Sequence, residues 1–303
     1  MRSRNSPVYK LGSNRQNRVA TRFDSSLERT GLFYLEIIQK TEGMTQSEKI
    51  DYLTLKRSVY REYSSSYDED RDRFVSGIVL AQRIDWALET LHPGGNLLDL
   101  GCGSGQLLRQ AIVIAGPDGR LAGLDLTPGM LKLARKELGA GVELVEGNAA
   151  TGLPFKEQAF DLVTSLNLVQ ELPIESVQTF FDGVYRLLRP GGTFRAVVPC
   201  MAVDNQANET FRRMALARAV MEFQYAGDLE RSLLDMPGFV EKKAEFYLST
   251  AAANAAKEAV RFTLFADILR DIESEGLDPS QVQQGVVCFT GKRGLSQRPP
   301  AAR

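Results

Sequence analysis

The feature that most constrains the fold is an alternation of short apolar segments with amphipathic ones between residues 96 and 199. The apolar segments have the length of buried strands, and the segments between them repeat apolar side chains every three or four residues. The predicted strands are Asn96–Leu100, Leu121–Leu126, Val142–Glu146, Phe160–Leu166 and Thr193–Pro199. Right-handed helical crossovers between such strands produce a parallel sheet covered on both faces. We therefore predict a doubly wound α/β fold.

The predicted helices between these strands are Gln106–Ala115, Pro128–Leu138 and Glu175–Leu188. We expect Thr127 to cap the second of them, because a threonine hydroxyl accepts from free amides and the following proline needs no donor. After Pro199 the pattern predicts a helix at 206–222, a strand near Phe239–Leu248, a long alanine-rich helix at 250–275 and a last strand at Gly285–Gly291. The prediction is thus a mostly parallel, seven-stranded sheet with helical additions, the long helix capping its carboxyl edge.

Composition limits the classes of protein that fit. The chain has 303 residues, 43% of them hydrophobic, and a formal net charge of −1, so the whole chain is not an electrostatic nucleic-acid binder. No apolar run approaches the length of a membrane span. The three cysteines form no CxxC pair and His92 is the single histidine, so we expect no metal site, no disulfide scaffold and a cytoplasmic location.

Residues 1–45 have no sustained periodicity, and the first 23 carry five arginines, one lysine and no acidic residue. We expect 1–45 to be a disordered or loosely attached basic leader, with import into an organelle as the alternative. Residues 46–303 are expected to form the folded domain.

The most informative motif is the glycine-rich segment that follows the first predicted strand, Leu97-Leu-Asp-Leu-Gly-Cys-Gly-Ser-Gly-Gln106. Glycines there allow a sharp turn and close approach to a ligand, and the next helix offers free amides. Gln106 stands where the dinucleotide-binding pattern GxGxxG has its last glycine. Asp99 would repel a pyrophosphate but suits the ammonium and sulfonium charges of S-adenosylmethionine. The loop therefore favours a cationic nucleoside over NAD.

Asp125 ends the second predicted strand, 20 residues after Gly105. A carboxylate at that place can accept hydrogen bonds from both hydroxyls of a ribose. The alternative is a turn residue that precedes the Thr127 cap. With the glycine loop in register, we favour the ribose role.

Four motifs in order resemble the class I S-adenosylmethionine-dependent methyltransferases, in particular the small-molecule branch related to quinone-biosynthesis enzymes. The motifs are LLDLGCGSG (97–105), GLDLTPGML (123–131), VEGNAATGLPF (145–155) with AFDLVTSLNLVQEL (159–172), and RLLRPGG (186–192). The resemblance covers about residues 60–200, which would form the cofactor-binding core of a Rossmann-like domain, and residues 201–292 would supply acceptor-side helices and the last strands.

The resemblance implies roles for individual residues toward S-adenosylmethionine. Gly101, Gly103 and Gly105, with Cys102 among them, would contact its methionine end, and Asp99 would hold its amino group. Asp125 would bind the ribose and Leu126 would pack on the adenine. Asn148 replaces the usual aspartate and would accept from the adenine amino group. The remaining implied contacts are the backbone of Ala149 and Leu166, and Tyr67 as a side chain closing over the cofactor, with a surface residue as the alternative for Tyr67.

The sequence departs from many relatives after the fourth predicted strand, where they carry histidines and this chain has Gln170-Glu171. Histidine base catalysis from that position is excluded. We expect Glu171 to begin a solvated helix, and the alternative is that burial makes it a proton acceptor. No other catalytic residue is predicted, because positioning and desolvation can drive attack on an activated methyl group.

The acceptor is expected to be a small, apolar or aromatic molecule methylated on oxygen, nitrogen or carbon. The aromatic and methionine side chains after Pro199 are predicted mainly as core, with a pocket for such an acceptor as the alternative. Nucleic acid is not expected as the acceptor, because Asn167-Leu-Val-Gln170 does not match the Asn/Asp-Pro-Pro-aromatic loop of base-methylating enzymes. The alternatives to a small-molecule enzyme are an RNA methyltransferase, a cofactor-binding scaffold without turnover and a dinucleotide oxidoreductase.

Overall fold

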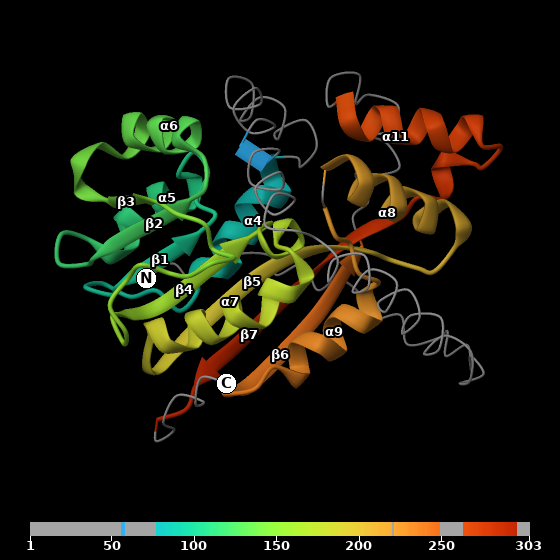
Figure 1. Ribbon diagram of the computed structural model, residues 1–303. Coiled ribbons are helices and arrows are strands. Elements are labelled where there is room, and N and C mark those ends of the chain that lie inside the picture. The colour runs from blue at the N-terminus through green and yellow to red at the C-terminus, as the bar shows by residue number, and fades with distance from the viewer. Residues whose placement is uncertain (1–55, 58–76, 220, 249–262, 296–303) are drawn as a thin grey trace, which may run out of the picture. The chain divides into compact units, whose positions relative to one another are not determined.

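The computed structural model describes residues 56–57, 77–219, 221–248 and 263–295, all of which belong to the unit Tyr52–Arg303. Strands within these residues form one seven-stranded sheet in the order β3-β2-β1-β4-β5-β7-β6 (Figure 1). Their bounds are β1 Leu97–Leu100, β2 Leu121–Asp125, β3 Glu143–Glu146, β4 Phe160–Leu166, β5 Leu188–Met201, β6 Phe239–Leu248 and β7 Gln284–Arg293. The first five strands pair in parallel, whereas β7 runs antiparallel to both β5 and β6. The predicted fold class is confirmed.

Helices cover both faces of the sheet. On one face, α4, α5 and α6 bury residues such as Leu88, Leu108 and Ala134 against β1 and β2. On the other face, α7 and α9 bury Phe181 and Leu229 in a second cluster with β4, β5 and β7. The bounds of these helices are α4 Gly77–Leu88, α5 Gln106–Ala115, α6 Pro128–Leu138, α7 Ile174–Leu187 and α9 Ala226–Asp235. This double cover explains the continuous apolar sequences of the central strands β1 and β4, because neither of their faces meets water.

A third cluster lies beyond the carboxyl end of β5, where α8 (Gln206–Ala219) packs near α11 (Thr263–Ser274) in Figure 1. Its buried side chains include Phe211, Met214 and Phe223. These aromatic and methionine residues are therefore core in this part of the chain, as their helical spacing indicated. Short 3-10 helices complete the described elements: η1 Gly139–Gly141, η2 Val169–Glu171 and η3 Pro279–Gln281.

Several element boundaries differ from the sequence prediction. The strand expected from Thr193 begins at Leu188, because Phe160 already pairs with Leu188 ahead of an irregularity in the β4–β5 register. Helix α8 ends at Ala219, before the predicted end at 222. Only α11 of the predicted helix 250–275 falls within the described residues, since 249–262 lie outside them. Helix α9 was not predicted.

The sheet order creates the place for a ligand. β1 lies between β2 and β4, and the chain leaves β1 toward α5 on one face and β4 toward α7 on the other. At such a switch point the loops diverge and leave a crevice outside the carboxyl ends of the strands. Among the described residues, no helix has the length and apolar character required to cross a lipid bilayer.

Candidate functional site

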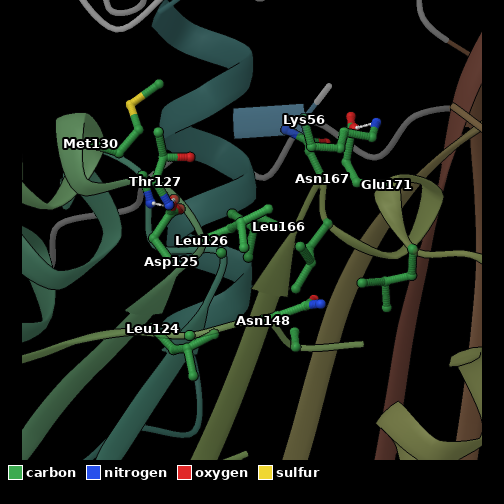
Figure 2. Close-up of a pocket in the computed structure, with 16 residues that line it drawn as sticks. Lys56, Leu124, Asp125, Leu126, Thr127, Met130, Asn148, Leu166, Asn167 and Glu171 are labelled. Carbon is green, nitrogen blue, oxygen red and sulfur yellow. Dashed lines mark hydrogen bonds and ion pairs between the residues drawn. The ribbon is translucent and has the colours of Figure 1, made fainter. Parts of the chain in front are cut away.

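A cavity lies at the carboxyl ends of β1, β2 and β4 (Figure 2). The predicted site residues that line it are Gly101, Gly103, Asp125, Leu126, Asn148, Ala149, Leu166 and Glu171. The chain thus brings together segments that the sequence separates by up to 70 positions, and it does so at the switch point.

The glycine loop adopts the backbone conformation for which glycine is suited. Gly101, Gly103 and Gly105 have φ values of 73°, 52° and 86°. The amides of Gly101 and Cys102 both donate to the carbonyl of Leu124, at 2.8 and 3.0 Å, which ties the loop to the end of β2. Side chains at these three glycines would be strained because positive φ places Cβ against the following backbone.

Asp125 links the glycine loop to the turn after β2. Its Oδ2 accepts from the amide of Gly103 at 2.9 Å, and its Oδ1 accepts from the amide of Thr127 at 2.9 Å. Thr127 occupies the cap position of α6 as predicted, but its side chain makes no capping hydrogen bond, so that part of the prediction was wrong. Burial raises the pKa of Asp125, although both amides lower it. The carboxylate keeps lone pairs for further donors from the cavity.

Asp99 lies in β1 beneath the loop and is not among the residues that line the cavity. The hydroxyl of Thr164 donates to its Oδ1 at 2.8 Å. Burial, with a smaller contribution from the charge of Asp125, raises the pKa of Asp99 to about 7, although the hydrogen bond from Thr164 lowers it. Cys102 is buried and, like Gly105, is not among the residues that line the cavity. Direct contacts of these three residues with a ligand stay predictions.

The wall near β3 is formed by Leu126, Asn148 and Ala149. The Oδ1 atom of Asn148 accepts from the amide of Ala150 at 3.0 Å, which fixes the side chain at the start of the loop after β3. One lone pair of this oxygen remains for a donor in the cavity. The arrangement offers two apolar side chains and one acceptor, which suits a flat heterocycle that carries an amino group.

The wall near η2 differs from the prediction. Glu171 is buried rather than solvated, and it forms an ion pair with Lys56, which is itself only 3% exposed. In Figure 2 both side chains lie beside Asn167 and away from Asp125. Lys56 was not predicted, because one lysine in an amphipathic segment carries no distinctive signal. Its helix lies more than a hundred positions before Glu171, so only the tertiary fold brings them together.

Asn167 is a second residue that the sequence analysis missed. It has φ of 59°, its amide donates to the carbonyl of Val197 at 2.9 Å, and its buried Oδ1 has no hydrogen-bond partner within the described residues. A buried acceptor without a partner costs free energy unless a ligand supplies the donor. Its position directly after the end of β4 is the one signal that could have marked it.

Comparisons with known proteins agree with this geometry. Residues 97–192 match a family described as "Methyltransferase domain". A demethylmenaquinone methyltransferase of Lactococcus lactis subsp. lactis is 28% identical over 196 residues, which are 58% of this chain and 75% of that protein. One from Listeria welshimeri is 32% identical over 162 residues, which are 50% of this chain and 63% of that protein. The chain contains a class I S-adenosylmethionine-dependent methyltransferase domain.

Solved structures place the methyltransferase domain in the same fold. Phosphoethanolamine N-methyltransferase 2 from Haemonchus contortus superimposes with a TM-score of 0.60 at 17% identity, covering 79% of this chain and 60% of that one. The [4+2]-cyclase SpnF superimposes with a TM-score of 0.58 at 17% identity, covering 80% and 97%. At such identities the likeness shows the fold alone, and the methyltransferase assignment comes from the sequence relatives.

The residues of the methyltransferase cavity fit S-adenosylmethionine as its cofactor. Buried carboxyl groups and the unpartnered oxygen of Asn167 offer acceptors to ammonium and hydroxyl donors. They would repel the phosphates of a dinucleotide. Tyr67, the residue expected to close over the cofactor, lies outside the described residues. No cluster of metal-ligating side chains occurs in the part of the chain that the structure describes.

Proposed function

We propose that this protein transfers the methyl group of S-adenosylmethionine to a small, apolar acceptor of the quinone type. The relatives named above are demethylmenaquinone methyltransferases, which motivates the acceptor class. The chain spans 75% of the length of one of these relatives and 63% of the other, so their substrate enters here as a proposal. When bound, the cofactor supplies an electrophilic methyl group on a positively charged sulfur.

The cofactor would lie across the carboxyl ends of β1 and β2. Asp125 would accept from the ribose hydroxyls, and Gly101 and Gly103 would let the methionine end approach the backbone. Leu126 and Ala149 would enclose the adenine, with Asn148 accepting from its amino group. The observation that carries this arrangement is the position of Asp125, which lines the cavity while its carboxylate is held by the amide of Gly103 at 2.9 Å.

The acceptor would approach from the side of η2. Leu168 and Leu172 line the cavity there and give it an apolar surface. Such a wall orients a flat, greasy ring and excludes water from the reacting atoms. Positioning of this kind supplies much of the acceleration in a displacement that needs no covalent intermediate.

The test is transfer of an isotopically labelled methyl group to a panel of acceptors by the purified protein. The panel contains dithionite-reduced demethylmenaquinone, unreduced demethylmenaquinone, phosphoethanolamine and bulk RNA. We expect label in the reduced quinone. The Gly103→Val variant should give none, because a branched side chain at φ of 52° distorts the loop that Asp125 holds. Label in RNA or phosphoethanolamine and none in either quinone would contradict the proposed acceptor class.

A further inference from the structure

A buried ion pair stands in the wall of the cavity. The Nζ atom of Lys56 donates to Oε2 of Glu171, and the two residues are 3% and 8% exposed. The side-chain nitrogen Nε2 of Gln170 donates to the other carboxylate oxygen, Oε1, at 3.4 Å. Both charged side chains line the same cavity as Asp125, and Figure 2 shows them at a different side of it. The pair therefore faces the space that ligands enter.

The fold gains little from burying these charges. Desolvation of two ions offsets most of their attraction, and apolar residues of similar size often replace such pairs without loss of stability. The neighbouring Arg57 forms an ion pair of the ordinary surface type with Glu146, in which the side chains are 47% and 45% exposed. Two adjacent residues of one helix thus make one exposed and one buried ion pair, and the buried one lies at the candidate reaction site.

We propose, on the basis of the proposed methyl transfer, that Lys56 and Glu171 act together on an acceptor that carries a weakly acidic hydroxyl group, such as a phenol or a hydroquinone. Glu171 takes the hydroxyl proton, and the ammonium group of Lys56 stabilises the oxyanion that remains. A phenol ionises near pH 10 in water, so an acceptor of this class needs such help at neutral pH.

The proposed step balances in atoms and charge. The acceptor O–H bond breaks, its proton passes to a carboxylate oxygen of Glu171, and the electron pair stays on the acceptor. That pair, at the oxygen or at a ring carbon conjugated with it, forms the new bond to the methyl group as the bond from methyl to sulfur breaks, and the electrons of the latter remain on sulfur. Lys56 exchanges one anionic partner for another, so the proton transfer creates no net charge within the buried site.

The other charged groups near this site make the role of Lys56 more specific. Asp125 lines the cavity from the end of β2, and Asp99 lies buried beneath the glycine loop. Both are acids and would oppose an oxyanion in the cavity. Among the described residues that line the cavity, Lys56 is the cationic side chain, and so it is the group that can favour the ionised acceptor.

The experiment uses 2-naphthol as a phenolic probe and the full-length protein saturated with S-adenosylhomocysteine. Absorbance of the naphtholate ion, titrated against pH, gives the midpoint at which the bound probe ionises. We expect Lys56→Met to raise this midpoint by at least about one pH unit, a tenfold change in the ionisation constant. Glu171→Gln, which is neutral like the protonated Glu171, should leave the midpoint nearly unchanged. Arg57→Met, the matched control, should leave it unchanged.

Proton counting tests the part assigned to Glu171. Calorimetric binding of 2-naphthol in buffers of different ionisation enthalpy should show that the wild type forms naphtholate without releasing a proton, whereas Glu171→Gln releases one to the buffer. The double variant Lys56→Met/Glu171→Leu removes both charges and guards against misfolding caused by one unpaired ion. It should ionise the probe no more readily than water does.

Each result bears on one claim. An unchanged midpoint in Lys56→Met, equal proton release by the wild type and Glu171→Gln, or failure of 2-naphthol to bind the complex would overturn the role of the pair. Binding of S-adenosylhomocysteine is measured first by calorimetry. Its absence would overturn the proposed function itself, which separates the two failures.

Discussion

Replacement of Asp99 by asparagine should change how the free energy of unfolding depends on pH. The carboxyl group of Asp99 is buried, and burial raises its pKa from 3.8 to about 7. Because the pKa is higher in the folded than in the unfolded state, the folded protein binds the proton more tightly between these values. The contribution of Asp99 to stability is therefore greatest below pH 4, falls as pH rises through this window and is lost above pH 7.

The magnitude follows from the two pKa values. At about 1.4 kcal/mol per pH unit, the interval from 3.8 to about 7 corresponds to about 4 kcal/mol of unfolding free energy. About 3 kcal/mol of this falls between pH 5 and pH 8. An asparagine side chain has the same shape as aspartate but does not titrate. The stability of Asp99→Asn should therefore lack this pH-dependent contribution. Asp125, whose pKa burial also raises, is present in both proteins and its contribution largely cancels.

The assay is urea unfolding of the ligand-free protein at pH 5 and pH 8. The wild type should lose about 3 kcal/mol more than Asp99→Asn between the two conditions. Asp118→Asn, a change at an exposed aspartate in the turn before β2, serves as the control and should behave like the wild type. Parallel pH dependence in the wild type and Asp99→Asn would refute the view that a buried, proton-binding carboxyl lies beneath the loop.

Three further changes test other parts of the structure. Gly105→Ala should lower the free energy of unfolding, measured by urea titration, by about 1–3 kcal/mol, because φ is 86° and the new Cβ would lie 2.7 Å from Cδ1 of Leu138. Gly116→Ala is the control and should cost less, because φ there is 67° but nothing lies within 4 Å of the new Cβ. Arg293→Met should destabilise by about 2–4 kcal/mol, since its Nη1 donates to the carbonyls of Tyr185, Arg186 and Leu188, and should leave calorimetric affinity for S-adenosylhomocysteine unchanged. Asp125→Ala should weaken that affinity by about 1–3 kcal/mol while Asp118→Ala does not, and equal affinities would reject the ribose role.

The sequence predicted the parallel part of the fold because local patterns carry that information. Helix α5 and strands β4 and β6 have the bounds that their periodicity indicated. Helix α9 was missed because its three buried residues, Ala226, Leu229 and Leu233, are too few to form a clear pattern in a short polar segment. The early start of β5 at Leu188 depends on pairing with Phe160, which no local pattern contains.

The candidate site was predictable to the extent that it follows strand ends. Asp125 and the glycine loop are marked by residue type and by their place after strands. Lys56 and the buried state of Glu171 were not predictable, because they depend on contact between segments 115 positions apart. Asn167 gave little signal, since the absence of a partner for its Oδ1 is visible only in three dimensions.

The central claim is that the cavity at the ends of β1, β2 and β4 holds S-adenosylmethionine with its ribose on Asp125. A crystal structure of the protein with S-adenosylhomocysteine tests it most directly. The account predicts ribose hydroxyls within hydrogen-bond distance of the Asp125 carboxylate and the adenine between Leu126 and Ala149. Ligand density elsewhere on the protein, or a ribose directed away from Asp125, would contradict it.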